Sequence, residues 1–354
     1  MICSVVGARP NFMKMAPVVL EIRRRGLPQL FVHTGQHYDE SMSGVFLSEL
    51  GLPQPDVSMG VGSGSHAEQT ARVMTSFEAI CLEHGPRLVL VAGDVNSTLA
   101  CALAAAKLRI PVAHIEAGLR SFDRSMPEEI NRLVTDHLSE LLFTTEPSGA
   151  QNLEREGISG ERVHFVGNTM IDSLNAHLPH ALERRPWRQY GLEPGAYGVV
   201  TLHRPSNVDD EAVARALAAA LKELATTLPL LFPMHPRTKA KFGGLWLSIP
   251  GLLVVEPLGY LDFIGIMASA KVVLTDSGGI QEETTALGVP CVTIRHNTER
   301  PITLTSGTNH LVPPTASMIV AAARDMDAGE HRVPPLWDGH AAPRIVDVIE
   351  RWMR

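Results

Sequence analysis

The sequence lacks several features that would place it in other classes of protein. Its 354 residues include only four cysteines, none in a CxxC pair, so we expect buried, reduced thiols and neither disulfides nor a cysteine metal site. No apolar run approaches membrane-spanning length, and the first residues lack the basic-then-apolar order of a signal peptide. The net charge of −7 comes without a basic block, which disfavours nucleic acid and anionic membranes as partners. We therefore expect a soluble cytoplasmic protein.

The alternation of apolar and amphipathic segments predicts the fold class. Short, β-rich apolar runs alternate with Ala/Leu-rich helical patterns in both halves of the chain, as in βαβ units with a parallel sheet. A chain of 354 residues is also longer than one core usually fills. We predict an α/β protein with two Rossmann-like, doubly wound domains that meet near residues 166–169, followed by a C-terminal helix.

Polar motifs follow most of the predicted strands. In parallel sheets, ligands bind beyond the carboxyl ends of the strands. Turn chemistry alone needs Gly, Pro and Asn but not repeated Arg, His and Glu. The motifs, in chain order, are GARPNFMKMAP, TGQHYD, GDVNSTLA, HIEAGLRSFDRSMPEEINR, LHRPSN, MHPRT, EPLGY and DSGGIQEE. Their positions predict a cleft between two facing sets of loops.

The last of these motifs predicts a nucleotide site. Ser277 stands at the start of a helix, and Gly278 and Gly279 leave its first N–H groups open to a bulky anion such as a diphosphate. Glu283, one turn further, has the chemistry to accept two hydrogen bonds from a ribose. The same residues are equally consistent with an ordinary helix cap, because no GxGxxG or Walker spacing is present.

The ordered motifs resemble those of one enzyme family. The series GARPNFMKMAPV, TGQHYD, GDVNSTLA, HIEAGLRS, MPEEINR, GNTMIDS, TLHRPSN, HPRT, EPLGYLDF, TDSGGIQEE and NTERP is similar to that of the non-hydrolysing UDP-N-acetylglucosamine 2-epimerases. The resemblance implies a GT-B architecture in which two Rossmann-like domains face each other across a cleft. The expected domains are residues 1–167 with 342–354, carrying catalytic carboxylates, and residues 168–341, binding UDP. It also implies a homodimer without a cofactor.

The resemblance assigns roles to individual residues. The expected catalytic residues are Asp94, Glu116, Glu128 and His203. The expected UDP-sugar-binding residues are Arg9, Lys14, Arg204, Ser277, Gly278, Gly279 and Glu283. His114, His235 and His296 show no ligand spacing, so no metal is expected.

Several of these residues also have simpler interpretations. Asp94 is placed to cap the helix that follows it, and Glu128 completes a capping box that starts at Ser125. A lone His203 is more often structural than catalytic. Lys14 is expected to brace its loop or an acidic neighbour. Glu116 is harder to explain away, because it follows an apolar strand where an unpaired carboxylate would be costly to bury.

The implied reaction is epimerisation at C2 of UDP-N-acetylglucosamine through elimination of UDP and its re-addition to 2-acetamidoglucal. Three alternatives are the 2-epimerisation of UDP-2,3-diacetamido-2,3-dideoxyglucuronic acid, a GT-B glycosyltransferase, and a catalytically inactive nucleotide-sugar sensor. Retention of three acids and a histidine argues against the last two.

The sequence departs from the family pattern at several positions. Asn11 stands where most relatives have Glu, and the segment 203–207 reads HRPSN rather than HRRE-N. In the TGQH loop, Gln36 and His37 are followed by Tyr-Asp-Glu in place of Arg-Glu-Met, which removes a cation. We therefore expect weak or absent activation by a second substrate molecule.

Overall fold

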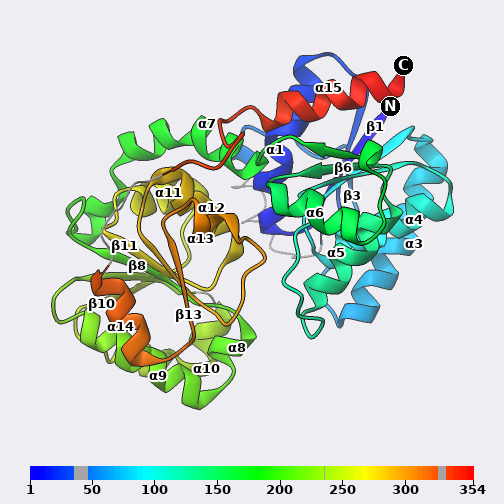
Figure 1. Ribbon diagram of the computed structural model, residues 1–354. Helices are drawn as coiled ribbons and strands as arrows, with labels where there is room; N and C mark the ends of the chain where they lie inside the picture. Colours follow the sequence, from blue (N-terminus) through cyan, green and yellow to red (C-terminus); the bar gives the residue numbers. More distant parts are fainter. Residues whose placement is uncertain (36–46, 235, 326–331) are drawn as a thin grey trace. The chain divides into compact units, whose positions relative to one another are not determined.

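The chain forms two compact units. The computed structural model describes residues 1–35, 47–234, 236–325 and 332–354. Unit 1 comprises Met1–Ala176 with Pro335–Arg354, and unit 2 comprises His177–Pro334. Each unit contains one parallel sheet with helices packed around it (Figure 1), which confirms the predicted α/β class with two doubly wound sheets. Helix α7 (Thr169–Arg184) contains the division between the units.

Unit 1 contains a seven-stranded sheet in the order β3-β2-β1-β4-β5-β6-β7. Its strands are β1 (Ile2–Val6), β2 (Gln29–His33), β3 (Val57–Ser58), β4 (Leu88–Ala92), β5 (Val112–Ile115), β6 (Leu141–Thr144) and β7 (Val163–Phe165). Its helices, besides part of α7, are α1 (Arg9–Arg24), α3 (His66–His84), α4 (Asn96–Lys107), α5 (Pro127–Leu138), α6 (Pro147–Arg155) and α15 (Ala341–Met353). Strands β1, β4, β5 and β6 are buried along their whole length, because helices cover both faces of the parallel sheet.

Unit 2 contains a six-stranded sheet in the order β10-β9-β8-β11-β12-β13. Its strands are β8 (Gly198–Thr201), β9 (Leu230–Pro233), β10 (Leu252–Val255), β11 (Val272–Thr275), β12 (Cys291–Ile294) and β13 (Asn309–Val312). Its helices, besides part of α7, are α8 (Pro205–Val208), α9 (Glu211–Leu224), α10 (Pro236–Leu247), α11 (Tyr260–Ala268), α12 (Gly278–Leu287), α13 (Ile302–Thr305) and α14 (Ala316–Asp325). The core between this sheet and α9 includes Trp246 and Phe232, whose rings meet edge to face.

Each sheet has one position where the strand order reverses direction. In unit 1 this switch lies between the paired strands β1 and β4, and in unit 2 it lies between β8 and β11. Loops from such neighbouring strands diverge to opposite faces of the sheet and leave a crevice at its carboxyl edge. The residues that follow these four strands are therefore the ones best placed to bind a ligand.

The C-terminal helix packs within unit 1. The apolar stripe of α15 is buried, and Arg25 at the end of α1 donates to Asp347 Oδ1 at 2.6 Å. Asp172 of α7 accepts from the first backbone N–H groups of α15, at 3.1 Å from Ala341 N and 2.7 Å from Ala342 N. Burial is the main reason that the pKa of Asp172 rises to about 6. Unit 1 is therefore assembled from the two ends of this chain.

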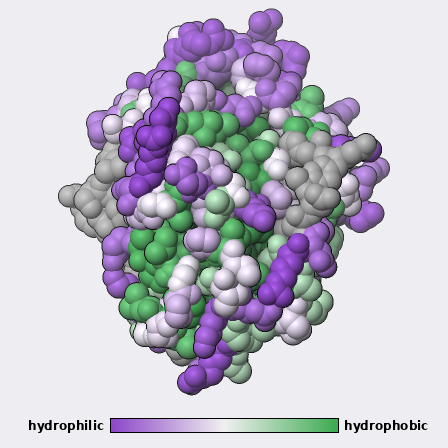
Figure 2. Space-filling view, turned by 90° about the vertical axis from the view of Figure 1, so that its left-hand side faces the viewer, coloured by the Kyte–Doolittle hydropathy of each residue, from purple (hydrophilic) through white to green (hydrophobic). Residues whose placement is uncertain are grey.

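The surface carries apolar side chains among polar ones. On the face seen in Figure 2, hydrophobic regions lie between long hydrophilic side chains. Among the described residues, Phe122 and Leu82 are the most exposed large apolar side chains, at 73% and 70%. No helix in the described part of the chain is both long and apolar enough to cross a bilayer.

Candidate active site

Asp94 follows β4 and pairs with an arginine. Its carboxylate forms an ion pair with Arg132 of α5, and its backbone oxygen accepts from Asn131 Nδ2 at 2.8 Å. The residue that caps α4 is Val95, with no side-chain cap hydrogen bond. The interpretation of Asp94 as a helix cap is therefore wrong, and two contacts fix this loop to α5 instead.

Glu116 stands directly after β5 in an unusual backbone conformation. Its φ is +72°, in the left-handed region that residues with a Cβ rarely adopt. Its buried carboxylate forms an ion pair with the buried Lys14 of α1. A Cβ added to Gly93 would lie 2.8 Å from Lys14 Nζ, so the ammonium group also lies against the end of β4. Lys14 therefore supplies the positive charge next to Glu116.

Glu128 lies in the first turn of α5 and is partly exposed. The cap of this helix is Met126, without a side-chain hydrogen bond, and Ser125 Oγ donates to Asp123 Oδ1 at 2.6 Å instead. The capping-box interpretation of Glu128 is therefore wrong. The adjacent Glu129 is the structural carboxylate, because it is buried and fully hydrogen-bonded.

The start of α1 differs from the family pattern in a way that the contacts explain. Asn11 Oδ1 accepts from Ala8 N at 3.0 Å, and Nδ2 donates to Ala92 O at 2.7 Å. A glutamate has no N–H with which to make the second bond. The backbone of Arg9 begins α1, but its side chain lies outside the described parts, as do Gln36 and His37.

His203 follows β8 in unit 2 and contacts Asp276, the residue directly after β11. Its Nδ1 lies 2.9 Å from Asp276 Oδ1, and its backbone N–H donates to Asp276 Oδ2 at 3.0 Å. Burial alone would raise the pKa of Asp276, but His203 and the backbone N–H groups lower it. Arg204 Nε donates to the Asp276 backbone oxygen at 2.9 Å. Asp276 therefore orients both residues at the switch point.

Helix α12 begins beside the same aspartate. Ser277 is its cap residue, but the hydroxyl makes no cap hydrogen bond. A Cβ on Gly278 would lie 2.7 Å from Glu299 Oε1 and 2.8 Å from Arg300 Nη1, so a larger residue would have to displace this ion pair. Glu283 is buried, and its Oε1 has no hydrogen-bond partner among the residues that the structure describes. Burial and the neighbouring Glu282 raise the pKa of Glu283 to about 8.

Three arginines surround Glu299 near the start of α12. Glu299 accepts from Arg295 Nη2 at 2.8 Å and Arg300 Nη1 at 2.6 Å, and Arg204 Nη2 lies 3.7 Å away. Burial would raise the pKa of Glu299, but the three guanidinium groups lower it. Within the described part of the chain, the buried Nη1 of Arg295 has no hydrogen-bond partner. Arg300 Nε also lies 3.0 Å from Glu282 Oε2, so guanidinium and carboxylate groups alternate beside Gly278.

Sequence reasoning missed several of these residues. Arg132, Asp276 and the Arg295–Glu299 pair were not predicted to belong to the site. The first two lie inside the motifs MPEEINR and TDSGGIQEE, and Glu299 lies inside NTERP, so the signal was present. Within each unit the structure brings the predicted residues together, Lys14 with Glu116 in unit 1, and His203, Arg204 and Ser277 around Asp276 in unit 2.

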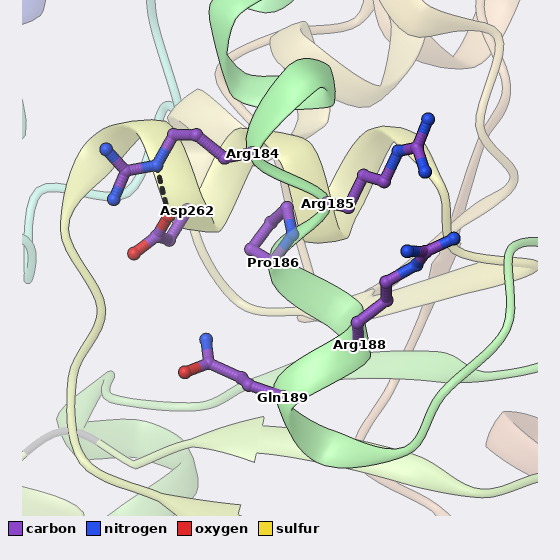
Figure 3. A pocket seen from close by; sticks show the side chains of 6 residues that line it. All are labelled: Arg184, Arg185, Pro186, Arg188, Gln189 and Asp262. Carbon is purple, nitrogen blue, oxygen red and sulfur yellow. Dashed lines mark hydrogen bonds and ion pairs between the residues drawn. The ribbon is translucent and has the colours of Figure 1, made fainter.

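A shallow depression on unit 2 lies apart from these residues (Figure 3). Its lining consists of Arg184, Arg185, Pro186, Arg188, Gln189 and Asp262. Arg184 Nε donates to Asp262 Oδ1 at 2.7 Å, whereas Arg185 and Arg188 point away from that carboxylate. No residue predicted for the site lines this depression.

Comparison with known proteins agrees with the motifs. The family model for UDP-N-acetylglucosamine 2-epimerase matches residues 21–350. A UDP-N-acetylglucosamine 2-epimerase of Methanococcus maripaludis is 40% identical over 98% of this chain and 97% of its own. A UDP-2,3-diacetamido-2,3-dideoxy-D-glucuronate 2-epimerase of Pseudomonas aeruginosa is 41% identical over 91% of each chain.

Solved structures agree as well. The crystal structure of the Methanocaldococcus jannaschii UDP-GlcNAc 2-epimerase in complex with UDP-GlcNAc and UDP matches with a TM-score of 0.92 and 37% identity, over 99% of this chain and 100% of the other. The two parallel sheets and this match confirm the GT-B fold expected from the motifs. The chain therefore belongs to the UDP-N-acetylglucosamine 2-epimerase family.

Proposed function

We propose that this enzyme interconverts UDP-N-acetylglucosamine and UDP-N-acetylmannosamine by inverting C2 of the sugar. The observation that carries the proposal is the edge of unit 2 at α12. There, a helix start whose cap side chain makes no hydrogen bond, three guanidinium groups, and a buried Glu283 oxygen that has no hydrogen-bond partner among the described residues lie close to one short segment. Helix starts and arginines bind diphosphates, and a buried carboxylate accepts from ribose hydroxyls. A nucleoside diphosphate sugar is the ligand with both groups.

The first chemical step is departure of UDP from C1. The C2–H bond of N-acetylglucosamine has no adjacent carbonyl to acidify it, so a carboxylate cannot remove this proton directly. When UDP leaves first, positive charge develops beside C2 and the proton becomes removable. The start of α12 at Ser277, Gly278 and Gly279 stabilises the departing diphosphate, with Arg204, Arg9 and the oriented imidazole of His203.

The second step is removal of the C2 proton, which gives 2-acetamidoglucal and UDP. Re-addition of UDP with a proton delivered to the other face of C2 then yields the manno isomer. Asp94, Glu116 and Glu128 of unit 1 are the acids and bases in our proposal, and Lys14 holds Glu116 in place through an ion pair. Their ion pairs support this role, because both paired carboxylates lie at the carboxyl edge of the sheet.

A single spectrum tests the proposal. Purified protein is incubated with UDP-N-acetylglucosamine in heavy water and followed by proton NMR. We expect the manno isomer to appear with deuterium at C2, because the original hydrogen is lost to a protein group that exchanges with solvent. Absence of any epimer contradicts the proposed activity, and epimer that retains its original hydrogen contradicts the elimination mechanism.

The second candidate substrate is UDP-2,3-diacetamido-2,3-dideoxyglucuronic acid. The relative from Pseudomonas aeruginosa that carries this name is as similar to this chain as the relatives named for UDP-N-acetylglucosamine. Its sugar has an additional carboxylate and a second acetamido group. We infer that kcat/KM is higher for UDP-N-acetylglucosamine, and a parallel assay with both sugars decides between them.

We further infer that the enzyme acts in the cytoplasm as a homodimer and supplies a precursor of cell-surface polysaccharide. All four cysteines are buried as free thiols, which suits a reducing compartment. Light scattering at micromolar concentration tests the oligomeric state, and a monomeric mass contradicts the homodimer.

A further inference from the structure

A buried histidine joins two of the elements that carry the acids. His114 lies in the middle of β5 and is fully buried. Its Nδ1 lies 2.6 Å from Asp136 Oδ1, and its Nε2 lies 2.8 Å from the backbone oxygen of Gly93. The first partner belongs to α5 and the second to the end of β4. One side chain thus links three elements of unit 1.

The other oxygen of Asp136 extends the network. Oδ2 accepts from Gly118 N at 3.0 Å and lies 2.7 Å from Arg120 Nη2. Arg120 in turn donates through Nε to Glu156 Oε1 at 2.8 Å. Asp136 and Arg120 are almost completely buried.

The hydrogen bonds fix the orientation of the His114 ring. A backbone carbonyl can only accept, so Nε2 donates to Gly93 O. Nδ1 then faces Asp136 Oδ1 at 2.6 Å. Burial alone would raise the pKa of Asp136, but His114 and Arg120 lower it. The ring is therefore held between the end of β4 and α5.

Each contact of the network lies near a proposed catalytic acid. Gly93 immediately precedes Asp94. Gly118 lies two residues after Glu116. A Cβ on Gly118 would lie 2.3 Å from a backbone oxygen of α6, so this turn packs too closely against α6 for any residue except glycine. Asp136 is on the same helix as Glu128. The three acids come from three separate elements, and the network fixes these elements to one another.

We propose that the His114–Asp136 pair is a positioning device that holds Asp94, Glu116 and Glu128 in register for proton transfer at C2. This inference rests on the proposed function. Replacing a buried ion pair by well-packed apolar groups is often neutral or stabilising, so fold stability alone explains the pair poorly. Geometry explains it better, because a displacement of about 1 Å at catalytic groups can reduce the rate about a hundredfold.

The kinetic test uses His114→Gln and Asp136→Asn. Glutamine keeps an N–H donor but no charge, and asparagine keeps the shape of the aspartate. At temperatures well below unfolding, we expect kcat to fall roughly tenfold to a hundredfold. We also expect more release of UDP and 2-acetamidoglucal per turnover. The affinity for UDP should be unchanged, because its proposed site lies on unit 2.

Asp172→Asn is the matched control, since Asp172 is another buried carboxylate of unit 1 that accepts two hydrogen bonds from backbone N–H groups. It should leave kcat unchanged at every pH at which the protein is folded, even where it alters stability. If the His114 and Asp136 variants only unfold at lower temperature, and their folded fraction keeps wild-type kcat, the network is structural and the inference is overturned.

A second measurement does not depend on activity or on variants that fold. NMR of wild-type protein with ¹⁵N-labelled histidine should show a ring N–H signal of His114 that exchanges slowly with solvent, because Nε2 donates to the buried backbone oxygen of Gly93. A ring N–H that exchanges as fast as that of an exposed histidine overturns the inference. A slowly exchanging ring N–H in a protein that does not epimerise UDP-sugars would contradict the proposed function and leave the hydrogen-bond network intact.

Discussion

The carboxyl edges of the two sheets differ in how their charges are arranged. At the edge of unit 1, acids follow the strands, and Glu116 and Asp94 form ion pairs with Lys14 and Arg132. At the edge of unit 2, three guanidinium groups surround Glu299, and the start of α12 adds the partial positive charge of a helix N-terminus. Two similar folds therefore present opposite chemistry, one suited to proton transfer and the other to holding an anion. Variants in the two units should consequently affect different kinetic constants.

The largest expected effect is on the acids of unit 1. Glu116→Gln, Asp94→Asn and Glu128→Gln each remove a proton carrier while keeping the shape of the side chain. We expect kcat to fall on the order of a hundredfold or more, the usual scale for loss of general acid–base catalysis. The affinity for UDP, measured by calorimetry, should stay within about twofold. Equal losses in kcat and in UDP affinity would remove the proposed distinction between the units.

The next effect concerns Glu283 in unit 2. Glu283→Ala should weaken UDP binding roughly tenfold to a hundredfold, as expected for losing hydrogen bonds to a charged group. The rate at saturating substrate should change little, because ribose contacts are similar in the ground and transition states. Unchanged UDP affinity in this variant would rule out Glu283 as the ribose ligand.

A smaller effect, the pH dependence of the affinity for the sugar nucleotide, also tests Glu283 as the ribose ligand. The pKa of Glu283 is about 8 in the ligand-free protein, so the carboxyl group must lose a proton before it accepts from a ribose. Affinity for UDP-N-acetylglucosamine should therefore rise as pH increases, roughly fivefold between about pH 7 and about pH 8, and level off above that. Glu283→Gln should abolish the dependence. An affinity that falls over this range would mean that the protonated form binds the sugar nucleotide.

The smallest effect on activity is expected for Asp172→Asn. The pKa of Asp172 in the folded protein, about 6, lies above the ordinary value of 3.8. Its favourable contribution to stability is therefore full below pH 3.8 and is lost as pH rises through about 6. The variant should gain stability relative to wild type as pH rises, as measured by urea unfolding at several pH values. Constant relative stability would contradict the raised pKa, and altered kcat would place Asp172 in the active site.

The helices, the strands and the residues at the strand ends can be predicted from the sequence more reliably than the contacts between distant segments. Apolar runs buried on both faces identify parallel strands, and in such sheets ligand residues follow the strands. For this reason the sequence alone places Asp94, Glu116, His203 and Ser277 near strand ends. That placement depends only on local pattern.

Pairings between distant segments could not be read in the same way. The partner of His114 is Asp136, which lies 22 residues away on a helix whose rotation is set by packing. Glu128 and Glu129 are adjacent in one motif, and only the start of α5 at Met126 decides which of them is buried. The local sequence pattern therefore predicts which residue types lie at the carboxyl edge of a sheet. The orientation of their side chains depends on tertiary contacts.

The construction of unit 1 from both ends of this chain has a consequence during synthesis. Residues 335–354 leave the ribosome only after all of unit 2, although α15 packs on α1 and its first N–H groups bond to Asp172. During synthesis, the apolar surface that α15 covers in unit 1 therefore stays exposed until residues 335–354 have been made. Unit 2 consists of one continuous segment, so all of it has been made before then. Because incomplete domains with exposed apolar surface are prone to misassembly, truncation of the chain before residue 335 should yield aggregated chains rather than a slower enzyme.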